Sequence, residues 1–208
     1  MGQDAACESL VTVTPVSLSW NTRSLLFALG AVAGLVGDRV HVDTFTTRYA
    51  DSAVPVIGSS PLWFPLATGV ATVVLAETRL RLPSPRTDRS LQQGIGAVAA
   101  VLAIYALTGI LHGSSLFSVT VLILALSALT WATFGDVQAA YVGLVAALVG
   151  PVLEMIGAAT GLFSYASDAD SLGGVAPWLP GLYFAFGVTA AVLGELGAAR
   201  TPRVSATG

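Results

Sequence analysis

The fold is decided by VQAAYVGLVAALVGPVLEMIGAATGLF, residues 137–163, an apolar stretch that contains a single charged residue, Glu154. A helix needs about 20 predominantly apolar residues to cross the hydrocarbon core of a bilayer. The other apolar runs carry no charge: Ser24–Gly37, Pro61–Ala76, Ile95–Leu111, Ser118–Phe134 and Trp178–Gly194. All of these except Ser24–Gly37 reach that length with a few flanking residues. The pattern predicts an all-α, polytopic membrane protein with six transmembrane helices. The shortest run, Ser24–Gly37, must begin earlier or continue through Asp38 and Arg39, a pair that we expect near the interface.

The composition of the whole chain favours the same class. Of its 208 residues, 54% are hydrophobic and 10% are charged, whereas about a quarter of the residues of a soluble domain are charged. A soluble helical bundle is the alternative, but its helices would keep a polar face, which these runs lack. A transmembrane β-barrel would show alternating segments of about ten residues. All basic residues are Arg in a chain rich in Ala, Gly and Val, which suggests a bacterial source and its plasma membrane.

The arginines predict the orientation, because cytoplasmic loops carry the excess of basic residues. With a cytoplasmic N-terminus, only Arg39 and Arg48 fall on the outer side, and the other seven arginines fall inside. We therefore expect both termini in the cytoplasm. The predicted organisation is a cytoplasmic segment over residues 1–22, a six-helix membrane domain over 23–197 and a cytoplasmic tail over 198–208. The start, MGQDAACESL, lacks the basic and apolar regions of a cleavable signal, so we expect none.

Glu154 is the one ionisable group that falls inside the six apolar runs. It follows Pro151, which removes a backbone hydrogen bond and clashes with the carbonyl four residues earlier, near Ala147. We expect a kink that opens space between helices. Intramembrane ionisable groups are candidates for function, so Glu154 is predicted to line a polar spot in a central pocket. The alternative is that Glu154 bonds a hydroxyl on a neighbouring helix and only fixes their packing.

Patterns for catalysis or metal binding are weak. The segment GIGAVA, residues 94–99, matches a dinucleotide fingerprint but begins a membrane span with no preceding strand. His41 and His112 are the only histidines, Cys7 is the only cysteine, and neither histidine belongs to a metal-ligand pair. An intramembrane aspartyl protease needs two carboxylates. We expect no enzyme, no metal, no cofactor and no nucleic-acid partner.

Three segments carry a resemblance to a known family. They are SSPLWFP at residues 59–65, followed by Gly69; LTWATF at residues 129–134; and GLFSY at 161–165, continuing to PWLPGLYFAFGVT at 177–189. In order and spacing they resemble the Insig family, the insulin-induced gene proteins of sterol control. The last segment is the most specific, and the resemblance extends over roughly residues 24–197. The six-span layout with both termini inside also agrees with that family.

The chain departs from the family pattern at several positions. Where the eukaryotic proteins carry an Asp tied to partner binding, this chain has Gly135, and Asp136 follows one place later. The second tryptophan of two family pairs is replaced by Phe64 and Ala132. Near Glu154 and Met155 the family carries Thr-Gln. The membrane core therefore resembles the family more closely than the edge that binds partners.

The resemblance implies a non-enzymatic membrane protein with a lipid cavity. Insig proteins bind oxysterols and retain sterol-sensing partners, which a bacterium lacks, so we expect those partners to be absent. The expected ligand is a membrane lipid, sterol-like or diacylglycerol-like, whose hydroxyl meets Glu154. Candidate cavity residues are Glu154, Met155, Pro151, Trp63, Phe64, Thr68, Trp131 and Phe184. For Trp63, Trp131 and Trp178 the alternative is a role as interfacial anchors.

Two further expectations concern transport and assembly. A small proton-linked transporter or lipid flippase could use Glu154 as its protonatable group. No second buried charge and no duplicated half with interrupted helices is evident in the sequence, which counts against this alternative.

Small residues at helix-packing spacing, such as Gly30 and Gly34, allow a homo-oligomer without requiring one.

Overall fold

The structure is a computed structural model that describes residues 17–50, 56–86 and 88–199. Its helices are α1 Trp20–Asp43, α2 Trp63–Arg81, α3 Leu91–Ile110, α4 Leu116–Phe134, α5 Val137–Ala159 and α6 Leu179–Ala199. All except α2 are long and apolar enough to cross a membrane by length and composition. The remaining helix, α2, ends in a charged turn with Arg79 and Arg81. The predicted all-α polytopic class with six helices is confirmed. Cys7, Asp51, Arg200 and Arg203 lie outside the described residues.

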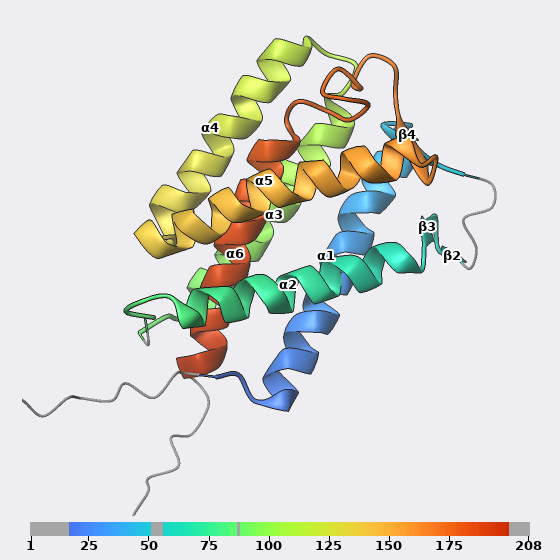
Figure 1. Ribbon diagram of the computed structural model, residues 1–208. Coiled ribbons are helices and arrows are strands. Elements are labelled where there is room, and N and C mark those ends of the chain that lie inside the picture. The colour runs from blue at the N-terminus through green and yellow to red at the C-terminus, as the bar shows by residue number, and fades with distance from the viewer. Residues whose placement is uncertain (1–16, 51–55, 87, 200–208) are drawn as a thin grey trace, which may run out of the picture.

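Helix α6 is the centre of the bundle (Figure 1). It contacts α2, α3, α4 and α5, and its side chains are buried along nearly its whole length. The other helices bury one face against α6 or a neighbour and expose large apolar side chains, such as Phe117 of α4 and Leu148 of α5, on the other. Exposed apolar faces all around a bundle would aggregate in water. This arrangement is that of a protein dissolved in lipid.

Close helix packing depends on glycine at a few contacts. A Cβ atom at Gly187 of α6 would lie 2.8 Å from the Cα atom of Gly143 of α5, so these two backbones touch. Gly30 and Gly34 of α1 lie against Thr72 and Thr68 of α2 in the same way. Small residues allow membrane helices to approach closely. The face of Gly30 and Gly34 is thus used within the chain and is not free for a second copy.

The ends of the helices follow local sequence signals. Ser90 and Gln93 form a capping box at the start of α3, and the Asp136 side chain accepts from the Ala139 N–H at the start of α5. Such side chains satisfy backbone N–H groups that have no partner within the helix. Helix α5 continues through Pro151 to Ala159. Helix α1 begins before and ends after the shortest predicted run, so Asp38 lies inside this helix and not in the loop that follows it.

Short strands close one end of the bundle. They are β1 Thr47–Tyr49, β2 Val56–Ile57, β3 Ser60–Pro61 and β4 Phe163–Tyr165. Strand β1, after α1, pairs antiparallel with β4, after α5, and β2 pairs with β3. The register places Thr47 opposite Tyr165 and Tyr49 opposite Phe163. We call this the strand end of the bundle; it joins two connections that are far apart in the sequence (Figure 1).

Candidate functional site

A large cavity lies beneath the paired strands β1 and β4. It has a volume of about 490 Å³, and its walls come from all helices except α4, together with β1 and β4. A second cavity of about 80 Å³ shares wall residues with it, including Phe64, Tyr105 and Glu154. Val74 of α2 and Leu153 of α5 line the large cavity and are more than half exposed. The cavity therefore opens between α2 and α5, which lie side by side in Figure 1.

Glu154 lies on the wall of both cavities and accepts two phenolic hydrogen bonds. The Tyr165 hydroxyl of β4 donates to Glu154 Oε2 at 2.5 Å, and the Tyr183 hydroxyl of α6 donates to Glu154 Oε1 at 2.6 Å. Both expectations for this side chain meet here, because it faces the pocket and also links α5 to β4 and α6. No serine or threonine hydroxyl contacts it among the described residues.

A second carboxyl lines the same cavity, at a position that no sequence pattern indicated. Asp38 of α1 is 2% exposed and accepts hydrogen bonds from the Tyr49 hydroxyl at 2.8 Å and from the Ser60 hydroxyl. Ser60 belongs to β3 and Tyr49 to β1, so both donors come from the strand end. We call the five groups Asp38, Tyr49, Glu154, Tyr165 and Tyr183 the cavity cluster.

The two strand tyrosines of this cluster remain neutral hydrogen-bond donors. Burial raises the pKa of Tyr49 far above its ordinary value, and the negative charges of Asp38 and Glu154 raise it further. Burial and then the charge of Glu154 likewise raise the pKa of Tyr165. Since both carboxyls act on Tyr49, they belong to one electrostatic site.

The predicted cavity residues divide into two groups. Glu154, Trp63, Phe64 and Thr68 line the large cavity. Met155, Pro151, Trp131 and Phe184 are not among its wall residues. Phe184 packs against Gly143, and the Trp131 indole donates to the Asp136 carbonyl at 2.8 Å. Trp178, for which an interfacial anchor was the alternative, is fully buried in the core.

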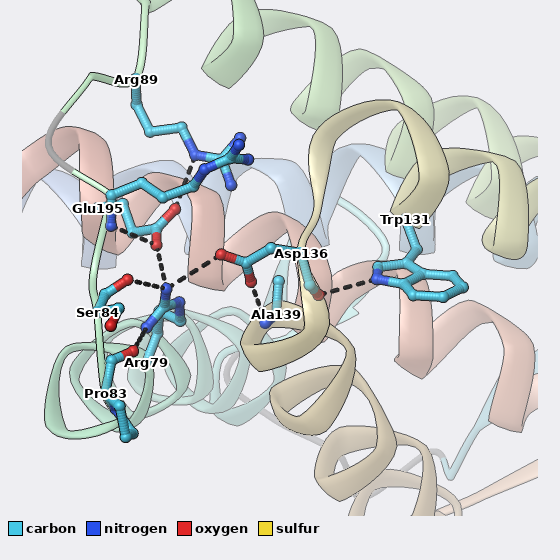
Figure 2. A network of polar contacts seen from close by, with 9 residues as sticks. Arg79, Pro83, Ser84, Arg89, Trp131, Asp136, Ala139 and Glu195 are labelled. Atoms are coloured by element: carbon cyan, nitrogen blue, oxygen red, sulfur yellow. Dashed lines mark hydrogen bonds and ion pairs between the residues drawn. The ribbon is translucent and has the colours of Figure 1, made fainter.

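A separate group of charges is buried at the opposite end of the bundle. Arg79 of α2 and Glu195 of α6 are fully buried, and the Arg79 Nη2 atom lies 2.6 Å from Glu195 Oε1. The Arg89 Nε atom lies 2.7 Å from Glu195 Oε2, and Arg79 also reaches Asp136 at 3.2 Å. We call Arg79, Arg89, Asp136 and Glu195 the charged cluster (Figure 2).

The charged cluster fixes the chain between α2 and α3. The guanidinium of Arg79 donates to the carbonyls of Pro83 and Ser84 (Figure 2). The Arg86 backbone N–H donates to Glu195 at 2.9 Å. Burial acts to raise the pKa of Asp136, but the Ala139 N–H and the positive charge of Arg79 outweigh it, so the pKa is lowered. Two cations balance two carboxylates here, which is the arrangement that a structural ion cluster requires.

Sequence reasoning missed Asp38, Arg79 and Glu195 as buried groups. Each lies within three residues of the end of a predicted apolar run. A charged residue in that position is normally assigned to the membrane interface or to a loop. The observed helices extend beyond those runs, so α1 includes Asp38, α2 includes Arg79 and α6 includes Glu195. No local signal in the sequence indicates that Ser60 and Tyr49 of the strand end meet Asp38.

The fold and cavity define a class, that of helical membrane proteins with an internal cavity. No protein-family model matches the chain. It is 49% identical over 180 residues to the INSIG protein homolog of Mycolicibacterium vanbaalenii, covering 86% of this chain and 88% of that protein. It is 27% identical over 184 residues to the insulin-induced gene 1 protein of Danio rerio, covering 82% of this chain and 70% of that protein.

The solved structures agree. The crystal structure of the mycobacterial Insig homolog MvINS from Mycobacterium vanbaalenii superimposes with a TM-score of 0.88 at 48% identity, over 90% of this chain and 99% of that one. A cross-linked MvINS trimer gives the same values. The chain belongs to the Insig family, and it is an integral membrane protein. The resemblance inferred from the three sequence segments is thereby confirmed.

Proposed function

We propose that this protein is a non-enzymatic sensor or scaffold of the bacterial plasma membrane that holds one membrane lipid in the large cavity. The cavity itself carries the proposal, because its volume of about 490 Å³ falls in the range of about 300–1,000 Å³ typical of ligand pockets. It combines apolar walls with one polar focus, as a lipid with a small hydroxyl head and apolar tails requires. Sterol-like and diacylglycerol-like lipids both have this form.

In this proposal the lipid head lies near Glu154 and the tails follow the apolar walls. Trp63, Phe64 and Thr68 lie on those walls, and Val74 and Leu153 mark the opening toward the bilayer. Met155, Pro151, Trp131 and Phe184 would then support the fold without touching the lipid. The strand end would face outward and both termini the cytoplasm, as the arginine distribution predicts.

The first experiment is native mass spectrometry of the protein purified in mild detergent. One defined lipid at near-unit stoichiometry supports the proposal and identifies the ligand. Glu154→Gln should lower the occupancy, while the matched control Met155→Leu, next in the chain but not on the cavity wall, should leave it unchanged. A lipid mixture that mirrors the bulk membrane in the unaltered protein would contradict a specific pocket.

A small proton-linked transporter or lipid flippase is the second candidate. One observation favours it, because Asp38 supplies the second buried carboxyl that the sequence did not reveal. Intramembrane carboxyls serve as proton relays in transporters. Reconstituted liposomes distinguish the two functions, since a flippase gives lipid movement that depends on pH and a sensor gives none.

We also propose a homo-oligomer, because a trimer of the related MvINS has been captured by cross-linking. Light scattering of the detergent-solubilised protein, corrected for bound detergent, gives the number of copies. A mass of one chain at all concentrations would contradict the proposal.

A further inference from the structure

The charge balance of the large cavity is unusual for a site that takes only neutral lipid. Two carboxyls, Asp38 and Glu154, line it, and no Arg is found among the described wall residues. His41 is on the wall, but its Nε2 atom is hydrogen-bonded to the Thr108 hydroxyl at 2.8 Å. Buried like charges without a counter-charge are costly. The charged cluster at the other end, with its two arginines, shows how the same chain neutralises carboxylates that it uses for structure.

Both carboxyls act as hydrogen-bond acceptors. Each of the two oxygens of Asp38 accepts one hydroxyl, from Tyr49 and Ser60, and each oxygen of Glu154 accepts one phenol. An ionised carboxyl, the form that a neighbouring ammonium group favours, offers about four lone-pair positions and donates nothing. About half of the acceptor positions are thus left for a ligand that brings hydrogen-bond donors and positive charge.

Aromatic rings surround the two carboxyls. Tyr49, Tyr105, Tyr165 and Tyr183 line the cavity, and Trp63 packs edge-on to Tyr49 with ring centroids 6.0 Å apart. The Tyr105 hydroxyl takes part in no hydrogen bond within the described residues. Aromatic faces attract cations, and clusters of them recognise ammonium groups. Carboxylates and aromatic rings together are the chemistry that selects an organic cation.

The remaining walls are apolar and select the rest of the ligand. Val145 and Val149 of α5 and Ala71 and Leu75 of α2 line the cavity, which continues to the opening beside Leu153. A hydrocarbon chain entering there from the bilayer would place its head at the cavity cluster.

We infer that the large cavity is a binding site for amphiphilic organic cations, molecules with a protonated amine head and a hydrocarbon chain, which occupy it in competition with the neutral lipid. The ammonium head lies between Asp38 and Glu154, and the chain follows the walls of α2 and α5. The inference rests on the proposed function in so far as the cavity must admit a lipid chain.

The test compares oleylamine, oleyl alcohol and oleic acid, which share one chain and differ in the head. Each is titrated by microscale thermophoresis against the protein in an uncharged maltoside detergent at pH 7. We expect oleylamine to bind at least about tenfold more tightly than oleyl alcohol, since only its ammonium head gains contacts with the two carboxyls and with aromatic faces. Oleic acid should bind least, because its carboxylate would face two others.

The double variant Asp38→Asn with Glu154→Gln should abolish the preference for the amine and retain oleyl alcohol. The matched control Asp168→Asn removes an exposed carboxyl of the loop that follows β4 and should retain the full preference. Should the double variant not fold, the affinities of the unaltered protein for the three probes still test the inference.

Two results would overturn the inference. The first is equal affinity for oleylamine and oleyl alcohol, or a preference for the amine that persists in the double variant. Either finding would contradict the cation site but not the proposed lipid cavity. The second is that neither oleylamine nor oleyl alcohol binds and that no defined lipid co-purifies. This finding would contradict the proposed function as well.

Discussion

The cavity cluster and the charged cluster place carboxyl groups inside the same bundle in opposite ways. Glu195 is held by two guanidiniums and is not among the wall residues of either cavity. Glu154 is held by two neutral phenols and faces a cavity of about 490 Å³. A buried carboxyl that is paired with arginines of the same chain stabilises an arrangement of helices. A buried carboxyl that lies on a cavity wall and has no such partner is suited to binding a ligand.

The largest expected effect is that of Glu195→Gln. The substitution keeps the shape of the side chain but leaves Arg79 and Arg89 buried with only Asp136 as counter-charge. Breaking a buried ion pair from one side costs about 3–5 kcal/mol. We expect a loss of stability of that order, seen as a large fall in the unfolding midpoint in detergent followed by circular dichroism. An unchanged midpoint would show that the charged cluster does not hold the bundle together.

Glu154→Gln should have a smaller effect on stability. The amide still accepts from one tyrosine, and no buried arginine loses its partner, so the expected loss is that of one hydrogen bond, about 1 kcal/mol. The same unfolding experiment should therefore give a change within about 1 kcal/mol. A loss as large as that of Glu195→Gln would erase the distinction between the two clusters.

The pH dependence of Asp136 sharpens the description of the charged cluster. Its folded pKa is lowered, so its stabilisation is fully present above the unfolded value of about 3.9 and is lost as the pH falls through the folded pKa. Asp136→Asn keeps a good helix-capping residue and removes the charge. The variant should unfold at a lower temperature than the unaltered protein at pH 7 and pH 5, and the gap should close below about pH 4. A gap that widens in acid would contradict the assigned sign.

The smallest expected effect is that of Arg81→Gln. Arg81 pairs with Glu77 one helical turn away, but its side chain is 71% exposed. Exposed pairs of this kind contribute at most about 0.5 kcal/mol. The variant is the matched control for the charged cluster, because it removes a carboxylate–arginine contact two residues from Arg79. A fall in the unfolding midpoint comparable with that of Glu195→Gln would mean that solvent exposure does not determine how much these ion pairs contribute to stability.

Part of the site was accessible from the sequence. Glu154 interrupts an apolar run, and a charge in that position is a local anomaly that needs no structure to be seen. Trp63, Phe64 and Thr68 were reached through the family resemblance, and the structure places them on the cavity wall. Asp38 could not be assigned, because a charge at the end of an apolar run has the same local pattern whether the helix stops there or continues past it.

The amino-acid sequence by itself determined the membrane class, the six helices and the family, because length, hydropathy and motif spacing are properties of consecutive residues. Tertiary structure decided the rest. Tyr49 and Tyr165 reach their carboxyls because β1 pairs with β4, and Arg89 meets Glu195 because α3 and α6 pack together. Such contacts depend on the relative placement of whole helices. That placement arises from the sum of many weak packing interactions, and no short segment of sequence contains it.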